Sequence, residues 1–278
     1  MKPFLPVIPI VGKIVRTSAD AFESLFGLRD ELIPPRSMRF VGNGNYKKDG
    51  NEFLAYFQKL GNLKPDDSVL DVGCGIGRKA GPLTRYLSPS ARYEGFDIVE
   101  NGIDWATKHI TAKYPNFRFT YTPLYNKKYS VYNKNHTGNY TEAAEKFRFP
   151  YEDDSFDFAF LTSVFTHMLP AELENYMSEI SRVLKKGGRC LITYFLINDD
   201  SQSYLDTGQR EFSFKYKFDK YRIETEEEPE DAVAYDETYI KEVYQKNSLQ
   251  IQEPIHYGNW CGRKNYLSGQ DIIVAQKQ

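Results

Sequence analysis

Three glycines at alternate positions follow an apolar stretch and give the strongest chemical signal in the sequence. Residues 69–78 read VLDVGCGIGR, which places Gly73, Gly75 and Gly77 directly after an expected strand. Glycine lets a backbone turn sharply and approach a ligand without an intervening Cβ. Asp97 follows 20 residues after Gly77, at the end of the run YEGFD, and an acid at that spacing can accept both hydroxyls of a ribose. The pattern therefore predicts a site for a cofactor that contains a nucleoside.

The spacing within the loop discriminates between two kinds of nucleoside cofactor. A dinucleotide such as NAD favours G-x-G-x-x-G, in which the third glycine permits close packing of helix against strand. Arg78 occupies that third position here, so the sequence disfavours a dinucleotide. Cys74 lies inside the loop, and we interpret it as a small residue whose backbone matters rather than as a redox or nucleophilic group.

The elements expected to position this loop alternate along the chain between strand-like and helix-like stretches. Such alternation is typical of an α/β fold in which helices cross over between parallel strands. The seven expected strands are Ser68–Val72, Arg92–Ile98, Phe117–Thr122, Phe156–Ser163, Arg189–Ile197, Ile251–Tyr257 and Asp271–Gln276.

Helical periodicity appears between these strands. Apolar residues recur every three or four positions in two stretches, and a third helix is expected from Asp236 to Lys246. We expect Pro170 to begin the second helix and the pair Gly187-Gly188 to end it. The recurring residues are Ile76, Ala80, Leu83 and Leu87 in the first stretch, and Leu173, Met177, Ile180 and Leu184 in the second.

Length and composition limit the class of protein. The chain has 278 residues, 41% hydrophobic and 27% charged, which suits one globular domain with appended segments. We expect an N-terminal extension over residues 1–50 and one domain over residues 51–278, with insertions near 124–148 and 199–235. A formal net charge of −2 disfavours nucleic acid or anionic lipid as the partner. The three cysteines form no CxxC pair, and the four histidines lack i, i+4 spacing, so neither a disulfide framework nor a metal site is expected.

The N-terminal run MKPFLPVIPIVGKIVR is interrupted by three prolines and is not followed by a small-x-small cleavage site. No window approaches the ~18 consecutive apolar residues that would span a bilayer. We therefore expect a cytoplasmic protein without a membrane span. The sequence does not define an oligomeric state.

Four ordered motifs resemble those of the class I S-adenosylmethionine-dependent methyltransferases. The glycine loop fits the first motif of that family, D-x-G-x-G-x-G, and Asp97 follows at the expected place. The segment FPYEDDSFD (residues 149–157) is similar to the family's approach to its fourth strand. The segment EISRVLKKGG (residues 179–188) is similar to the helix and turn before its fifth. The resemblance covers about residues 65–198, and the whole arrangement, including GLRDELIPP (residues 27–35) and HYGNWCG (residues 256–262), resembles uncharacterised bacterial methyltransferases. It implies a Rossmann-like, mostly parallel sheet of seven strands with helices on both faces, an N-terminal lid and insertions.

The resemblance also implies a role for individual residues in binding S-adenosylmethionine. The backbone of Gly73, Cys74, Gly75 and Gly77 would hold the methionine portion, with Asp71 close to its amino group. Asp97 would bind the ribose and Ile98 would flank the adenine, whereas Leu161 and Thr162 would line the methyl-donor end. The alternatives are that Asp71 only caps the turn at the end of its strand, and that Asp97 is an exposed acid.

The methyl acceptor is less well defined by the sequence. The chain lacks the N-P-P-Y or D-P-P-Y tetrapeptide after the fourth strand, which argues against methylation of adenine or glutamine side-chain nitrogen. The segment Leu161–Met168 is similar to that of small-molecule methyltransferases, and we expect O-methylation of a small polar molecule. His167 is the candidate general base, because a neutral imidazole can accept a hydroxyl proton near pH 7. The alternative is a structural histidine within the helix that begins there.

Three further segments contain candidate pocket residues. By the resemblance, the N-terminal segment crosses the cofactor, so that Phe40 and Tyr46 would close the pocket. The insertion after the third strand and the HYGNWCG segment (residues 256–262) contain hydrogen-bonding aromatic residues that suit a polar acceptor. The alternatives are an exposed elaboration and structural packing, respectively. The candidates in these two segments are Tyr125, Asn126, Tyr132, His136, Tyr257 and Trp260.

Two other functions remain open at this point. A non-catalytic module could retain the fold and bind the cofactor alone. An RNA methyltransferase could use the basic stretch Lys215–Arg222, in which aromatic residues that can stack on bases are interleaved. An acidic run follows that stretch directly and the whole chain is not basic, which disfavours RNA.

Overall fold

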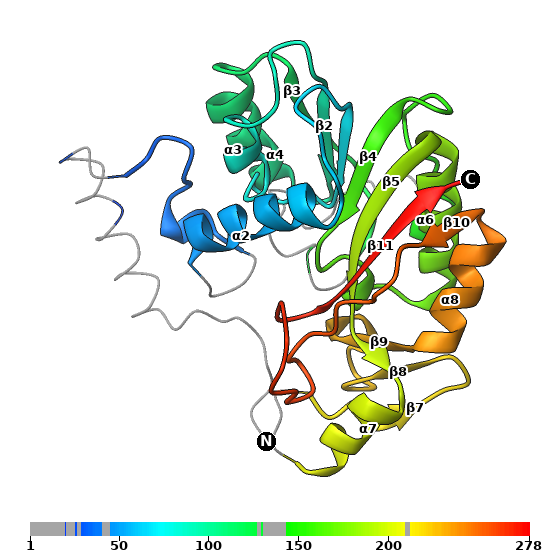
Figure 1. The fold of residues 1–278 in the computed structure, drawn as a ribbon. Helices are drawn as coiled ribbons and strands as arrows, with labels where there is room; N and C mark the ends of the chain where they lie inside the picture. Colours follow the sequence, from blue (N-terminus) through cyan, green and yellow to red (C-terminus); the bar gives the residue numbers. More distant parts are fainter. Residues whose placement is uncertain are drawn as a thin grey trace.

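The computed structural model describes residues 20, 26, 29–40, 45–126, 129, 143–208 and 212–278. Its centre is a seven-stranded sheet in the order β10-β11-β5-β4-β1-β2-β3 (Figure 1). Strands β1 to β5 run parallel, whereas β11 pairs antiparallel with β5 and with β10. The predicted fold class is confirmed. The strands are β1 (Val69–Val72), β2 (Tyr93–Asp97), β3 (Phe117–Tyr121), β4 (Phe156–Leu161), β5 (Leu184–Tyr194), β10 (Leu249–Ile251) and β11 (Asp271–Lys277).

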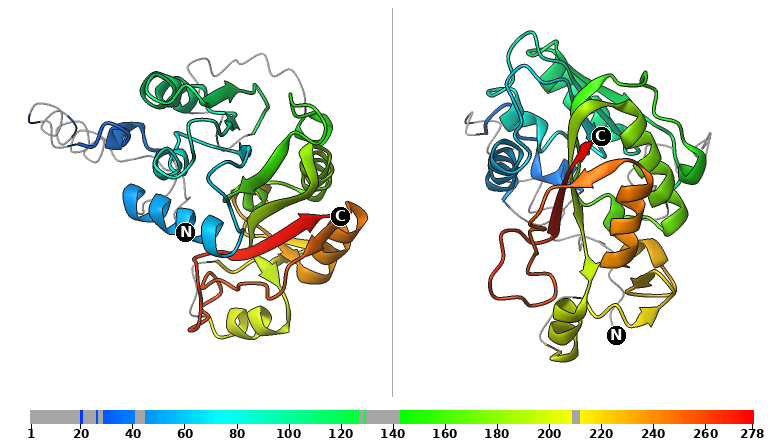
Figure 2. Two further views of the ribbon diagram at one scale, coloured as in Figure 1. Left: turned by 45° about the horizontal axis from the view of Figure 1, so that its top comes forward. Right: turned by 45° about the vertical axis from the view of Figure 1, so that its right-hand side comes forward.

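Helices cover both faces of this sheet, as the right-hand view of Figure 2 shows for α2 on one side and for α6 and α8 on the other. The first face packs against α2 (Tyr46–Lys59), α3 (Ala80–Leu83) and α4 (Glu100–Ala106), which is continued by the π-helical turn η2 (Thr107–Thr111). The second packs against α6 (Pro170–Val183) and α8 (Glu237–Lys246). Central strands are buried on both faces, so β1 is a continuous apolar run interrupted only by Asp71.

A second, smaller sheet is formed largely by the region 199–235, for which the sequence shows no clean periodicity. Its strand order is β6-β9-β8-β7, and helix α7 (Asp199–Asp206) follows β6. These strands are too short for a period to be visible, which is why the sequence predicts only an insertion here. They are β6 (Leu196–Ile197), β7 (Tyr216–Lys217), β8 (Tyr221–Ile223) and β9 (Val233–Asp236).

Several predicted boundaries are wrong. The expected strand Ile251–Tyr257 is β10, which ends at Ile251, and only an isolated bridge joins His256 to Ile272 farther along. The helix after β1 is a single turn, α3, although all four of its predicted apolar residues are buried. Helix α6 ends at Val183 rather than at the glycine pair, because Leu184 already begins β5. Gly187, with φ of +78°, lies within that strand, where its register against β4 shifts.

Short helical turns complete the fold between these elements. Among the described residues no helix is long and apolar enough to cross a membrane. The predicted division at residue 50 falls within α2, which begins at Tyr46, and the division into an extension and a domain stays a prediction. The turns are η1 (Arg36–Met38), η3 (Ala144–Lys146), η4 (Phe165–His167) and η5 (Pro229–Asp231).

Candidate active site

The glycine loop leaves the carboxyl end of β1, where the sheet order reverses between β2 and β4. This switch point is where open α/β sheets bind ligands. Gly73 and Gly77 have φ of +76° and +80°, and a Cβ on either would lie 2.4 Å from Val164 Cγ2 or 2.7 Å from Ile110 Cδ1. Positive φ favours glycine at both positions, and at Gly73 the space beside Val164 excludes a Cβ as well, whereas the end of the Ile110 side chain beside Gly77 can shift.

Gly75 plays a different part in the same loop. Its φ is +56°, but a Cβ there would meet nothing closer than Phe40 Cζ at 4.0 Å, so its outer side is open toward the cavity. Gly102 of α4 backs the loop, because a Cβ at Gly102 would lie 2.9 Å from the Gly75 carbonyl oxygen. Gly102 was not recognised from the sequence, since nothing local distinguishes it from any other helical glycine.

Asp97 at the end of β2 binds the loop directly. Its Oδ2 accepts the Gly75 N–H at 2.7 Å and its Oδ1 accepts the Val99 N–H at 2.8 Å. Burial raises the pKa of this carboxyl to about 6, against the effect of the backbone donors. Ile98 is a third backbone donor to this carboxylate, so about one of its lone-pair sites remains for a ligand hydroxyl.

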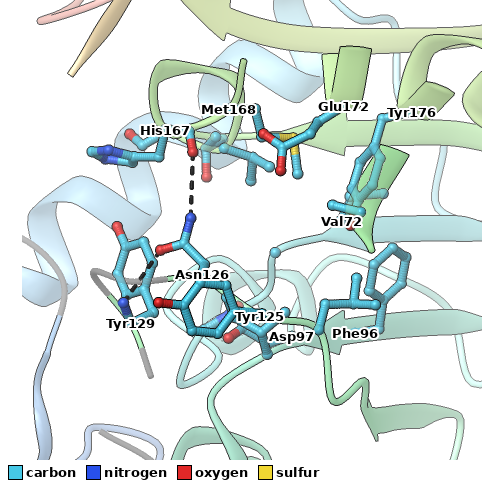
Figure 3. A pocket seen from close by; sticks show the side chains of 18 of the residues that line it. Val72, Phe96, Asp97, Tyr125, Asn126, Tyr129, His167, Met168, Glu172 and Tyr176 are labelled. Carbon is cyan, nitrogen blue, oxygen red and sulfur yellow. Dashed lines mark hydrogen bonds between the residues drawn. The ribbon is translucent and has the colours of Figure 1, made fainter. Parts of the chain in front are cut away.

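A cleft with an empty volume of about 760 Å³ opens beside the loop (Figure 3). In Figure 3, Asp97 and Tyr125 lie on one side of it, facing Met168 and Glu172 on the other. Of the predicted site residues, the cleft brings together Gly73, Gly75, Asp97, Ile98, Thr162, Phe40, Tyr125, Asn126 and His167.

His167 lies in η4 at the rim of the cleft. Its Nδ1 lies 3.0 Å from the carbonyl oxygen of Glu230, which can only accept, so Nδ1 donates a proton there. The ring meets Tyr129 edge-on at a centroid distance of 5.7 Å. In Figure 3 the imidazole points away from the centre of the cleft, while the His167 carbonyl faces Asn126.

Glu172 and Tyr176 face the interior of the cleft from the first turns of α6. Glu172 Oε2 accepts the Leu169 N–H at 2.8 Å and so caps the helix. Burial, followed by the nearby carboxylates of Glu230 and Glu145, raises the pKa of Glu172 to about 7. Neither residue was predicted from the sequence. The only available signal was an acid at the third position of a helix opened by Pro170, which is typical of an ordinary cap.

Asp71 does not line the cleft. It is buried on the opposite face of the sheet, where the Tyr93 hydroxyl donates to its Oδ2 at 2.5 Å. Burial raises its pKa to about 7, while the Tyr93 hydrogen bond and the nearby Lys79 ammonium act in the other direction. Tyr46 lies on this side too, and its hydroxyl donates to the Ile76 carbonyl at 3.1 Å, which ties α2 to the glycine loop from outside.

The remaining predicted residues lie elsewhere. Leu161 and Cys74 are buried and do not line the cleft. Trp260 donates its Nε1–H to Asp271 Oδ2 at 2.7 Å within an aromatic cluster, and the Tyr257 hydroxyl donates to Glu237 at 2.9 Å. Neither lines the cleft. Tyr132 and His136 lie outside the described residues.

The side chains around the cleft suit a nucleoside better than a metal ion. Within the described part of the chain no group of three or more His, Cys, Asp or Glu side chains could hold a metal ion. A nucleoside joined to a slender chain fits this site, because the glycine loop is open at Gly75 and the buried carboxyl group of Asp97 lies beside it.

Comparison with known proteins agrees with this geometry. Residues 70–192 match a family model described as a methyltransferase domain. The match identifies a methyltransferase domain in the central part of the chain, in agreement with the resemblance to the class I S-adenosylmethionine-dependent methyltransferases. S-adenosylmethionine is the cofactor that this match and the glycine loop indicate.

The relatives differ in what they methylate. Phosphoethanolamine N-methyltransferase 2 of Caenorhabditis elegans is 26% identical over 179 residues, which cover 64% of this chain but only 32% of that protein. Magnesium protoporphyrin IX methyltransferase of Synechocystis, with bound SAH, has a TM-score of 0.52 and 16% identity over 94% of this chain and 99% of its own. A 1,6-didemethyltoxoflavin-N1-methyltransferase of Burkholderia thailandensis has a TM-score of 0.50 and 16% identity, and the match covers 100% of this chain and 93% of that protein. At these identities the structural likeness establishes the fold alone.

Proposed function

We propose that this methyltransferase transfers a methyl group to an oxygen atom of a small polar molecule. The observation that carries the proposal is the continuity of one cleft from Asp97, at the loop that would hold the nucleoside, to Glu172 and His167, which can accept a proton. S-adenosylmethionine, when bound, supplies a methyl group on a positively charged sulfur. The protein's task is then to hold the acceptor in line with that bond and to remove the acceptor's proton.

The donor side of the cleft is assigned to the loop and its neighbours. Asp97 would accept a ribose hydroxyl, Ile98 would lie against the adenine, and the backbone at Gly73 and Gly75 would contact the amino-acid portion. Thr162 would line the end where the methyl group is transferred. Phe40 lies close to Gly75 and Gly102, which supports the assignment of the N-terminal segment that contains Phe40 as a lid over this site.

The acceptor side is small and mixed in character. Tyr125, Asn126, Tyr129 and Tyr176 line it, so it offers aromatic faces together with hydrogen-bonding groups. Because the same cleft must also hold the donor, we expect the acceptor to be small.

An RNA acceptor receives less support. The basic stretch Lys215–Arg222 forms β7 and most of β8 of the smaller sheet and contributes no residue to the cleft. Its rings are engaged with one another, because Phe218 and Tyr221 stack at 4.7 Å with an interplanar angle of 7°.

The test is incubation of the purified protein with methyl-tritiated S-adenosylmethionine and a cell extract separated into small-molecule and macromolecular fractions. We expect label in the small-molecule fraction, in a product whose methyl group is on oxygen by its proton and carbon chemical shifts. Label confined to RNA or protein would contradict the proposal. Tight cofactor binding without transfer to any fraction would instead identify a non-catalytic module.

A further inference from the structure

The wall of the cleft opposite Asp97 contains an acidic group that none of the comparisons assigns. We propose that Glu172, rather than His167, accepts the proton of the methyl acceptor, and that Tyr176 orients the acceptor beside it. The inference rests on the proposed function, since it assigns a residue to that reaction.

The geometry of Glu172 leaves one oxygen for a ligand. Oε2 accepts the Leu169 N–H at 2.8 Å, which fixes the carboxylate at the start of α6. Among the described residues the structure gives Oε1 no hydrogen-bond donor, and Figure 3 shows the carboxylate directed into the cleft. A fixed carboxylate with one free oxygen is suited to accept a proton, because it loses little further entropy when the acceptor binds.

Tyr176 supplies the neighbouring contact. It lies four residues after Glu172 and thus on the same face of the helix. Only 3% of Tyr176 is exposed, and its hydroxyl has no hydrogen bond to any described residue. Burial raises the pKa of Tyr176, so its hydroxyl stays protonated and can both donate to and accept from an acceptor group.

Burial and the neighbouring charges bring the pKa of Glu172 close to neutral pH, where a general base works best. Glu230 approaches from η5 and Glu145 from η3, and both add to burial in raising its pKa to about 7. Asp97 lies across the cleft, and His167 is the nearby ionisable group in η4. A base whose pKa lies near the working pH combines ionisation with proton affinity, which is the condition for efficient general-base catalysis.

His167 is less well placed for the same task. Its Nδ1 is held at 3.0 Å from the Glu230 carbonyl, and its ring lies against Tyr129 at the rim. The imidazole therefore points away from the space between Asp97 and Glu172, as Figure 3 shows. We assign it to holding η4 and η5 together around that space.

The step balances without another reactant. A lone pair of the acceptor oxygen forms the new bond to the methyl carbon as the bond from that carbon to sulfur breaks. Sulfur keeps the bonding pair and becomes a neutral thioether. The hydroxyl proton moves to Glu172 Oε1 and leaves to solvent after product release.

The experiment compares Glu172→Gln with Glu174→Gln, a control on the same helix whose side chain pairs with Tyr239 and Lys246 outside the cleft. In Glu172→Gln the amide oxygen of the new side chain can still cap the helix, so the fold should be retained. Tritium transfer from S-adenosylmethionine into the small-molecule fraction is measured from about pH 5.5 to 9, and cofactor affinity by calorimetry. We expect Glu172→Gln to lose about 10²–10⁴-fold in rate while its cofactor Kd stays within threefold.

The pH profile separates a base from a merely structural residue. In the wild type and in Glu174→Gln the rate should rise toward a plateau above about pH 7, because the ionised carboxylate is the active form. Glu172→Gln should lack that rise, Glu172→Asp should restore part of the rate, and His167→Asn should keep the rise whatever its plateau.

Other outcomes would contradict either the assignment of Glu172 as the base or the proposed function. Glu172→Gln with wild-type rate and profile, or loss of the rise in His167→Asn alone, would overturn the assignment of the base while leaving methyl transfer established. A wild-type protein that binds the cofactor but labels no small molecule would overturn the proposed function instead.

Discussion

The most informative single substitution is Asp97→Asn, because this carboxylate joins the glycine loop to the expected ribose site. The substitution removes the charge but keeps the size of the side chain. One amide oxygen can still accept a backbone N–H, whereas the amide NH₂ then faces the other backbone donor at 2.7 or 2.8 Å. A ribose hydroxyl would donate to the remaining lone pair, and a hydrogen bond to a charged group contributes about 1.5–3 kcal/mol. Losing it weakens cofactor binding by the same amount, which is roughly 10- to 150-fold in Kd.

Isothermal titration with S-adenosylhomocysteine and with its 2′-deoxy analogue measures this loss at about pH 8, where Asp97 is ionised. The deoxy ligand lacks one of the two ribose hydroxyls, so a double-mutant cycle isolates the ribose contribution from any change in the loop. Glu94→Gln is the matched control, because Glu94 lies on the same strand but does not line the cleft. We expect a coupling free energy of about 1.5 kcal/mol or more. Equal losses for both ligands would show that Asp97 acts on the loop alone and would refute the ribose assignment.

Three further predictions concern the same site and its surroundings. Gly102→Ala should weaken the binding of S-adenosylhomocysteine about tenfold or more, because the new Cβ would lie 2.9 Å from the Gly75 carbonyl oxygen and displace the loop. Unchanged affinity by calorimetry would mean that α4 moves instead of the loop. The cofactor Kd should be constant above about pH 6 and rise up to tenfold per pH unit below it, because burial raises the pKa of Asp97 to about 6 and the protonated acid loses acceptor capacity; a flat titration between about pH 5 and 8 would contradict this. Trp260→Phe should lower the free energy of unfolding by about 2 kcal/mol through the lost bond to Asp271, at unchanged cofactor Kd; unchanged stability in a denaturant titration together with weaker methyl transfer would place Trp260 at the acceptor instead.

The part of the site that depends on local spacing could be predicted from the sequence. Gly73 and Gly77 follow a buried strand, and their positive φ angles favour glycine, so the pattern can be recognised without a structure. Asp97 ends the next strand, and adjacent parallel strands bring their carboxyl ends to one edge of the sheet. Both inferences need no knowledge of long-range packing.

The acceptor side depends on how distant segments pack, and the sequence could not define it. Glu172 reaches the cleft because the start of α6 packs on the same face of the sheet as Val72, a contact between residues far apart in the sequence. Trp260 was expected near the acceptor, but Asp271 binds the indole in a separate aromatic cluster. Asp71 lies one residue from the cleft-lining Val72, and strand alternation turns it to the opposite face.

A crystal structure of the protein with S-adenosylhomocysteine tests the central claim most directly. We predict a ribose hydroxyl within hydrogen-bond distance of Asp97, the amino-acid portion along Gly73 and Gly75, and the sulfur facing the space in front of Glu172. A ligand bound elsewhere, or one whose sulfur faces away from Glu172, would contradict this arrangement.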